Sequence, residues 1–433
     1  MNPALSELLQ AAWTNHQDGN HSTALMQYRI ALKHFGDSSL AWECYSILLY
    51  DLKRFDDCID ACRRALELDP SCNPARTTLR AALNNMLVTA TISGNPRNIS
   101  TLADQLMEYL DDDPVEQMFE LSSIKLLLGE FGPGWSLYEK RLESHSFSGA
   151  KALLRYPRWD GKPYRRETLL VHGEQGFGDS IMMMRYLEMV KSLGGTLILF
   201  VPEALVGLAK ECRGPDMVIG QASENVPFNH QLPMMSLPFI FDTNLENIPN
   251  KVPYIGLPSH VPNKEAIDAR LAVSGCAKIG IAWAGRPSYK RDSERSMAPE
   301  ILRPLEAAPN ASWFCLQRDG HDVVPFPSAT PLGDLFDTFV DTAYAVSQMD
   351  AIVTVDTSIA HLAGAMGTHV KLMVSCPPDW RWLLWRSDSP WYPTLKIYRQ
   401  PSPGDWQSVV QQVLADLVAE NYSVSPIDWH RLS

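Results

Sequence analysis

The first 145 residues carry apolar positions at helical spacing and few runs of β-branched side chains. Small residues at the first and third positions of a repeated motif allow two antiparallel helices to approach closely, and a glycine or proline then ends the second helix. This pattern predicts a helical repeat array over residues 1–145, with a generic helical bundle as the alternative. The motif recurs after 34 residues, as Ala24, Tyr28, Ala31 and Gly36 and then as Cys58, Cys62, Ala65 and Pro70.

The pattern changes after Pro157-Arg-Trp-Asp-Gly161. Short apolar runs rich in β-branched residues now alternate with amphipathic helical stretches, which predicts α/β layers. The expected strands are Thr168–His172, Thr196–Val201, Lys278–Ala284, Ser312–Gln317, Ala351–Asp356 and Val370–Ser375. The expected helices are Ser180–Leu193, Pro299–Ala308, Ile359–Met366 and Asp405–Ala419.

A proline-rich stretch from Pro249 to Pro262 divides this region into two halves. Each half opens with a strand that runs into a glycine-containing loop. We therefore expect two Rossmann-like lobes, over residues 146–260 and 261–433, the second ending in a helix. The predicted fold class is an α-helical N-terminal domain followed by two α/β lobes.

Composition narrows the class of protein. The 433 residues suit two to four domains, and 45% hydrophobic with 20% charged residues is ordinary for a soluble globular protein. A net charge of −12 argues against a nucleic-acid-binding face. We expect no membrane span, no secretory leader and reduced thiols, hence a cytoplasmic protein. Cys58 and Cys62 lack further metal ligands nearby, and no resident cofactor or metal is expected.

The first glycine-containing loop reads His172-Gly-Glu-Gln-Gly-Phe-Gly-Asp179 and leads into a helix. Glycines let backbone amides approach a ligand, so Gly176, Phe177 and Gly178 are candidate backbone contacts. Asp179 is either a helix-capping residue or a functional carboxylate. The spacing Gly-x-x-Gly-x-Gly differs from the dinucleotide fingerprint, which disfavours a dehydrogenase.

The second loop runs from Gly285 to Ser296 and holds four cations in ten residues. Its position at the end of a strand suits a phosphate-bearing ligand. The alternative is a solvated loop whose acids, Asp292 and Glu294, neutralise part of the charge. The cations are Arg286, Lys290, Arg291 and Arg295.

A third loop, Asp356-Thr-Ser358 followed by His361, leads from a buried strand into a helix. Free amides and hydroxyls at such a helix start form an anion site, although His361 could equally be a core histidine. A fourth segment, Pro378-Asp-Trp380-Arg-Trp382, follows a strand, and its aromatic and arginine groups could stack on a base or sugar ring. Trp380 and Trp382 are the candidates for stacking, with packing between the lobes as the alternative.

Together these motifs resemble bacterial glycosyltransferases that combine tetratricopeptide repeats with the GT-B fold. Such proteins are related to lipopolysaccharide heptosyltransferases and, in architecture, to O-GlcNAc transferase. The resemblance runs from about Gly129 to Trp406. Besides the loops above, it rests on Phe131…Trp135…Tyr138…Arg141, Trp159-Asp-Gly161, Asp379-Trp-Arg-Trp382 and Asp388-Ser-Pro-Trp-Tyr-Pro393.

The resemblance implies a nucleotide sugar held by the C-terminal lobe and an acceptor that meets it across a cleft. Asp179 would then be the base that deprotonates the acceptor hydroxyl. Asp356, Thr357, Ser358 and His361 would hold the donor diphosphate, and Arg295 and Ser296 match the family's Arg-Ser pair. Arg286-Pro-Ser-Tyr289 stands where relatives usually show Asn-Pro-x-His, which leaves the donor sugar and activity open.

We therefore predict an inverting transferase that moves a sugar from a nucleotide sugar to an acceptor hydroxyl, with a protein acceptor bound by the repeats. No Asp-x-Asp accompanies the basic loop, so cations and hydroxyls are expected to replace a metal. The alternatives are a glycan or lipid-linked acceptor and a non-catalytic peptide-binding scaffold. The sugar, the nucleotide, the acceptor and any homo-oligomer stay open.

Overall fold

The computed structural model describes residues 2–110, 114–145, 147, 149–220, 226–272, 275–289, 291–318, 320 and 323–420. The chain divides into two compact units, Met1–Ile124 and Lys125–Ser433. Within the described ranges, no helix combines the length and the apolar character needed to cross a membrane.

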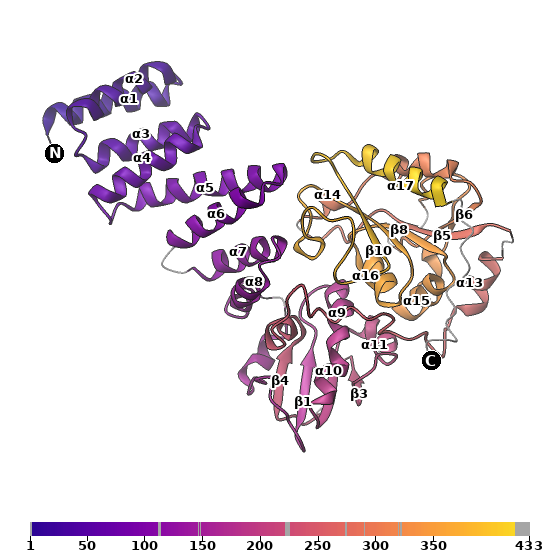
Figure 1. The fold of residues 1–433 in the computed structure, drawn as a ribbon. Coiled ribbons are helices and arrows are strands. Elements are labelled where there is room, and N and C mark those ends of the chain that lie inside the picture. Colours follow the sequence, from indigo (N-terminus) through magenta and orange to yellow (C-terminus); the bar gives the residue numbers. More distant parts are fainter. Residues whose placement is uncertain are drawn as a thin grey trace. The chain divides into compact units, whose positions relative to one another are not determined.

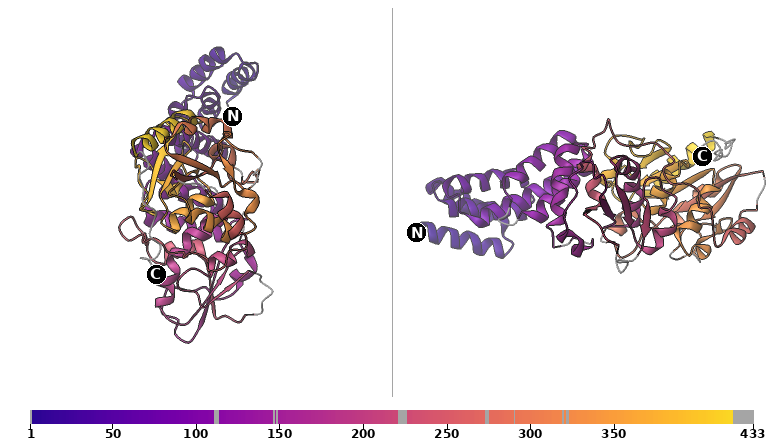
Figure 2. Two further views of the ribbon diagram at one scale, coloured as in Figure 1. Left: turned by 90° about the vertical axis from the view of Figure 1, so that its right-hand side faces the viewer. Right: turned by 90° about the horizontal axis from the view of Figure 1, so that it is seen from below.

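The first unit consists of helices that lie side by side with their sequence neighbours (Figures 1 and 2). The six repeat positions with small or aromatic side chains, from Ala24 to Ala65, are fully buried. Gly36 and Pro70 each lie two residues beyond the end of a helix, as expected of residues that end helices. The predicted helical repeat is confirmed. The helices are α1 Pro3–Gln17, α2 His21–His34, α3 Ser39–Asp51, α4 Phe55–Leu68, α5 Asn73–Ser93 and α6 Pro96–Glu108, and α7 Val115–Leu127 runs across the division between the units.

The N-terminal lobe of the second unit is built on a parallel sheet of order β3-β2-β1-β4. The strands are β1 Thr168–His172, β2 Thr196–Phe200, β3 Met217–Ile219 and β4 His230–Pro233. Strand β1 pairs on both sides, so the loop that follows it leaves from the middle of the sheet. The helices are α9 Phe177–Met183, η3 Met184–Tyr186, α10 Leu187–Ser192, α11 Glu203–Ala209, η4 Met234–Ser236 and α12 Leu237–Ile240.

The C-terminal lobe is built on a parallel sheet of order β10-β9-β8-β5-β6-β7. Counted within the lobe, this is the 3-2-1-4-5-6 order of doubly wound nucleotide-binding sheets, which confirms the predicted Rossmann-like architecture. The strands are β5 Ala277–Ala282, β6 Ala311–Cys315, β7 Thr330–Pro331, β8 Ala351–Val355, β9 Val370–Val374 and β10 Leu395–Arg399. The helices are α13 Lys264–Arg270, α14 Asp292–Arg295, η5 Pro299–Ala307, η6 Gly333–Leu335, α15 Phe339–Ser347, α16 Ser358–Ala365, η7 Trp380–Trp382 and α17 Trp406–Glu420.

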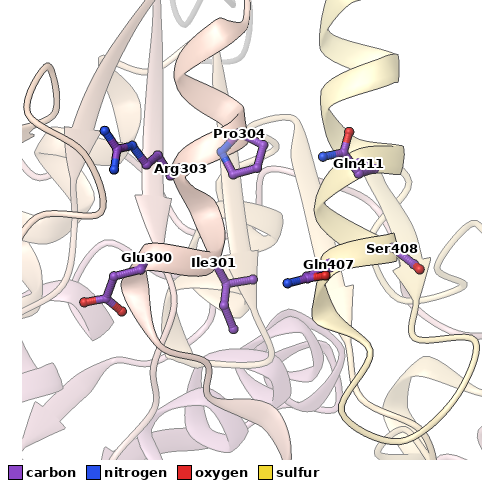
Figure 3. Close-up of a pocket in the computed structure, with 7 residues that line it drawn as sticks. All are labelled: Glu300, Ile301, Arg303, Pro304, Gln407, Ser408 and Gln411. Carbon is purple, nitrogen blue, oxygen red and sulfur yellow. The ribbon is translucent and has the colours of Figure 1, made fainter.

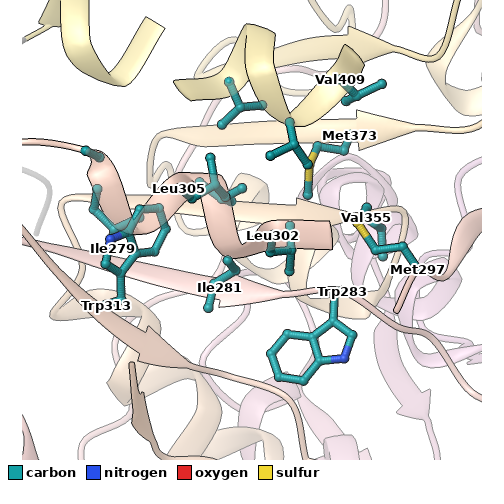
Figure 4. Packing of buried hydrophobic residues seen from close by; sticks show 14 of the residues in the cluster. Ile279, Ile281, Trp283, Met297, Leu302, Leu305, Trp313, Val355, Met373 and Val409 are labelled. Atoms are coloured by element: carbon teal, nitrogen blue, oxygen red, sulfur yellow. The ribbon is translucent and has the colours of Figure 1, made fainter. Parts of the chain in front are cut away.

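One face of this sheet packs against η5 and α17 (Figure 4). Ile281 and Val355 from the strands, Leu305 from η5 and Val409 from α17 are all fully buried there. The expected α-helix at this position is a 3₁₀-helix, since Pro304 has no N–H to donate and disrupts an α-helical ladder.

Three short helices precede the N-terminal sheet within the second unit: α8 Phe131–Tyr138, η1 Glu139–Leu142 and η2 Lys151–Arg155. Trp135 and Tyr138 of α8 are buried, as is Arg141 of η1. The indole N–H of Trp135 donates to the carbonyl of Thr243 at 3.1 Å. Residues 125–145, which the periodicity alone groups with the repeats, therefore form part of the core of the second unit.

Candidate functional site

The candidate site lies at the switch point of the C-terminal sheet, where β5 and β8 are neighbours but their connections run in opposite directions. Ligands of doubly wound sheets bind outside the carboxyl ends of the strands at this point. The basic loop follows β5, and Asp356 follows β8 directly. Arg295 Nη1 donates to the backbone carbonyl of Asp356 at 2.8 Å, so the second and third loops of the sequence prediction meet.

Two cations of the basic loop, Arg291 and Arg295, are paired with acids of the same loop. Arg291 contacts Glu294 at 2.6 Å, and Arg295 Nε donates to Asp292 at 3.1 Å. The Ser296 hydroxyl donates to Asp292 at 2.9 Å and accepts from the amide of Gly285 at 2.9 Å. Ser296 and Asp292 thus fix the loop close to the end of β5. Lys290 lies outside the described residues.

Asp179 occupies the first turn of α9. Its Oδ2 accepts from the amide of Gly176, the N-cap residue, at 2.9 Å, so the capping interpretation holds in part. Its Oδ1 accepts from Arg381 Nη2, which comes from the other lobe. Asp179 is therefore both a helix cap and half of an ion pair between the lobes.

Helix α9 also packs directly against the C-terminal lobe. A Cβ atom placed on Gly178 would lie 2.7 Å from Cδ2 of His361, so only glycine fits this approach. Phe177 packs edge-on against Phe339 with ring centroids 5.1 Å apart. These residues, predicted as backbone contacts for a ligand, bring the loop that carries Asp179 up to α16.

Arg381 lies between Trp380 and Trp382, in the segment whose aromatic and arginine groups are expected to meet a ligand ring. Its Nη1 donates to Asp379 at 2.8 Å, and its guanidinium lies 4.2 Å from the centre of the Trp380 ring. Burial disfavours its charge, but Asp379 and Asp179 outweigh that effect and raise the pKa of Arg381. Arg381 is thus a buried cation between two carboxylates.

His361 is 4% exposed and stacks on Trp382 with ring centroids 5.3 Å apart. Its Nδ1 lies 2.8 Å from the Tyr392 hydroxyl, and its Nε2 lies 3.9 Å from Asp356 Oδ1. Burial, together with Arg381, Arg185 and Arg295, lowers the pKa of His361 well below its ordinary value. His361 is therefore neutral, and any contact it makes to a phosphate is a hydrogen bond from an uncharged ring.

Asp356 lies between the end of β8 and the start of α16 in the C-terminal lobe. Burial, and secondly the nearby charge of Asp379, raises its pKa to about 6. Thr357 begins α16 as its N-cap residue and is buried, while Ser358 is half-buried. A perturbed acid beside a helix start at a sheet switch point is typical of functional sites.

The tryptophans predicted for ligand stacking are buried. Trp382 is fully buried, and Trp380 is 5% exposed and packs edge-on against Trp135 at 5.2 Å and Trp391 at 6.2 Å. Both tryptophans therefore have packing contacts within the second unit, and their stacking on a ligand ring stays a prediction.

A second buried arginine, Arg185, escaped the sequence prediction. It donates to the carbonyl of Trp391 at 2.6 Å and to the Tyr254 hydroxyl at 3.1 Å, and lies 4.5 Å from the centre of the Tyr392 ring. Trp391 and Tyr392 belong to the motif Asp388-Ser-Pro-Trp-Tyr-Pro393. That motif was the one signal in the sequence that this segment lies near the site.

A groove lies apart from these residues. An open groove of about 850 Å³ runs between η5 and α17 and contains none of the predicted site residues (Figure 3). The groove is lined by Glu300, Ile301, Arg303, Pro304, Gln407, Ser408 and Gln411. In the described part of the chain, no group of three or more His, Cys, Asp or Glu side chains is arranged to hold a metal.

No protein-family model matches the chain. Protein FlbA of Caulobacter vibrioides is 26% identical over 344 residues, which cover 71% of this chain and 55% of that protein. The chain thus spans about half the length of this curated relative.

Two solved structures are examples of those similar to this chain. A family 9 glycosyl transferase from Veillonella parvula covers 59% of this chain and 98% of its own, with 11% identity and a TM-score of 0.44. The tetratricopeptide-repeat protein YrrB covers 32% of this chain and 67% of its own, with 14% identity and a TM-score of 0.24. Glycosyltransferases and repeat proteins are both among the solved structures similar to this chain.

Proposed function

We propose that this chain is a glycosyltransferase that moves a sugar from a nucleotide sugar to an acceptor hydroxyl with inversion. The observation that carries the proposal is the Arg381–Asp179 pair, which brings the carboxylate of one lobe to the switch point of the other. A nucleotide donor suits that switch point, and an acceptor suits the glycine-containing loop on the opposite side.

Asp179 acts as the base in this mechanism. A carboxylate offers about four lone-pair positions, and Gly176 and Arg381 occupy two of them, so an acceptor hydroxyl can still donate to Asp179. As the hydroxyl oxygen attacks the anomeric carbon, its proton passes to Asp179 and the bond from that carbon to the nucleoside diphosphate breaks. A single displacement of this kind inverts the configuration.

Charge leaving with the diphosphate is stabilised on the C-terminal side. Arg295 lies beside the start of α16, where backbone N–H groups and the hydroxyls of Thr357 and Ser358 suit an anion. His361 adds an uncharged donor. These groups are fixed before the reaction, and the proposed transferase therefore works without a divalent metal.

The acceptor is proposed to be a protein bound by the helical repeats in the cytoplasm. Val88 and Ile92 lie one turn apart on α5, and the two residues are 58% and 39% exposed. Exposed apolar pairs on a repeat surface suit an extended peptide. A glycan or lipid-linked acceptor is the alternative.

A panel of sugar nucleotides tests the activity. The wild-type chain should release nucleoside diphosphate from at least one donor, and release should rise when cell extract supplies an acceptor. Mass spectrometry of the extract then identifies whether the product is a protein, a glycan or a lipid. A chain that binds no donor and releases no nucleotide would leave the peptide-binding scaffold as the better function.

The role of the repeats has a separate test. Replacing Val88 and Ile92 by glutamate should abolish transfer to a protein acceptor while donor hydrolysis continues. Val418, a half-exposed apolar residue on α17, provides a matched control as Val418→Glu. Unchanged protein transfer by the double variant would contradict the proposed peptide surface.

A further inference from the structure

Helix α8 and the 3₁₀-helix η1 contact the loop between β1 and α9 directly. The Tyr138 hydroxyl lies 3.1 Å from Oε1 and 3.0 Å from Nε2 of Gln175, and so can donate to the first atom and accept from the second. Tyr138 is 3% exposed. A buried hydroxyl therefore fixes the Gln175 side chain.

The neighbouring residue of the loop is held by an ion pair. Arg141 donates from Nε and Nη2 to the two oxygens of Glu174, at 2.9 and 2.8 Å. The Glu174 side chain is fully buried, and it also accepts from the amide of Met235 at 2.8 Å. Such a two-point pair fixes geometry more than it adds stability.

These two contacts lie immediately before the turn that carries the proposed base. Gly176 follows Gln175, begins α9, and donates its amide to Asp179. A displacement of residues 174 and 175 would therefore move the first turn of α9 and the carboxylate with it.

Helix α8 also contacts the other side of the ion pair. Trp135 and Tyr138 pack on Trp380, with ring centroids 5.2 and 6.2 Å away. Trp380 in turn lies under the guanidinium of Arg381. Helix α8 therefore contacts Gln175, which precedes the turn of Asp179, and Trp380, which packs on Arg381.

We propose that Tyr138 is a positioning residue for Asp179. Helix α8, which follows the repeats in the sequence, then belongs to the transferase site. The proposal rests on the proposed function for its effect on turnover. The effect of Tyr138 on the loop between β1 and α9 can be measured without any activity. The positioning role and the transferase function can therefore fail separately.

The test uses the full-length chain with Tyr138→Phe, Gln175→Ala and the double variant. Phenylalanine keeps the ring that packs on Trp380 and removes only the hydroxyl. Loss of one buried hydrogen bond should lower kcat about two- to tenfold, while KM for the donor stays within about twofold. Because both residues act through one contact, the double variant should be no slower than the slower single variant.

Hydrogen exchange of the ligand-free chain supplies the second readout. Amides of residues 173–179 should exchange faster in Tyr138→Phe, again by about two- to tenfold. Tyr164→Phe is the matched control, since the buried Tyr164 hydroxyl donates to the carbonyl of Val190 at 3.3 Å in the same lobe. That variant should change neither the exchange of this loop nor kcat.

Each result decides. Faster exchange in the loop with a reduced kcat supports the proposal. Faster exchange in a chain whose wild type transfers no sugar supports the positioning of the loop but rejects the proposed function. Unchanged exchange, or additive losses in the double variant, would overturn the role of Tyr138.

Discussion

Arg381 donates a hydrogen bond to Asp179, although 202 positions separate the two residues in the sequence. Their side chains are only 10% and 19% exposed, and the same guanidinium contacts Asp379 at 2.8 Å. The pair connects α9 of the N-terminal lobe to η7 of the C-terminal lobe. The proposed base is thereby joined to the lobe that is proposed to bind the donor.

Replacing Arg381 by methionine should destabilise the protein. The change would leave Asp179 and Asp379 near each other without their shared cation, which should lower the free energy of unfolding by about 3 kcal/mol. Urea unfolding measures this. Arg386→Met is the control, because Arg386 pairs with a largely exposed carboxylate, that of Asp388, and should change stability by less than about 0.5 kcal/mol. Equal effects of the two variants would show that the Arg381 pair has no structural role.

Asp179→Asn should lose transfer but retain the donor. Removing a general base typically lowers turnover by about 10²–10⁴. Donor affinity, measured by calorimetry, should change little because the proposed donor contacts come from the other lobe. Asp388→Asn also removes a carboxylate from an arginine pair and should keep full activity. If Asp179→Asn turned over normally, Asp179 would be a helix cap and a lobe contact only.

The sequence was sufficient to predict an element where the pattern of that element alone identifies it. The buried strands β1, β2, β5, β6, β8 and β9 were predicted to within two residues at their ends, since each is a short run of apolar side chains between turns. Strand β4 was missed because His230-Gln-Leu-Pro233 is short and half polar. Strand β10 was missed because it has only five residues, two of them charged, and Pro393 lies two residues before it.

The site was predictable only in part, for a different reason. Loops that follow neighbouring parallel strands must meet, so the basic loop and Asp356 could be grouped from the sequence. The sequence marks Arg381 only as part of an aromatic segment and Arg185 not at all, because both arginines act through contacts with residues remote in sequence. The same limit applies to Tyr138 and Arg141, whose helical spacing indicates a repeat but not the loop that they contact.

Stability should depend on pH through Asp356. Its pKa is raised from 3.8 to about 6, so between these values the folded protein binds the proton more tightly than the unfolded chain. The free energy of unfolding therefore falls as pH rises through this window and then levels off. Asp356→Asn should remove that loss, making the variant more stable than wild type by about 2 kcal/mol at pH 7.5 and similar to it near pH 4. Urea unfolding at several pH values checks this, and a variant less stable at pH 7.5 would contradict it.

Transfer should continue in excess EDTA if the proposed cationic donor site is correct. Arg295→Ala would remove a charged hydrogen-bond donor beside Asp356 and should weaken donor binding about ten- to a hundredfold. Arg270→Ala is the matched control, since Arg270 also pairs with a carboxylate, that of Asp334, but lies on α13, outside this loop. Loss of activity with EDTA that magnesium or manganese restores would show that the diphosphate is stabilised by a metal instead.

Two shortened chains should behave differently according to whether they keep α8 and η1. A chain starting at Val115 retains Tyr138 and Arg141, and should bind the donor like the full-length protein. A chain starting at Lys151 loses Arg141 and so leaves the fully buried Glu174 carboxylate without its cation, a change that costs several kcal/mol. It also uncovers the apolar surface that Trp135 buries, which favours aggregation. We expect low soluble yield and an earlier urea midpoint for the shorter chain, partly restored by Glu174→Gln because the unpaired charge is then removed. If the shorter chain unfolded at the same urea concentration and bound the donor equally well, α8 and η1 would be dispensable to the site.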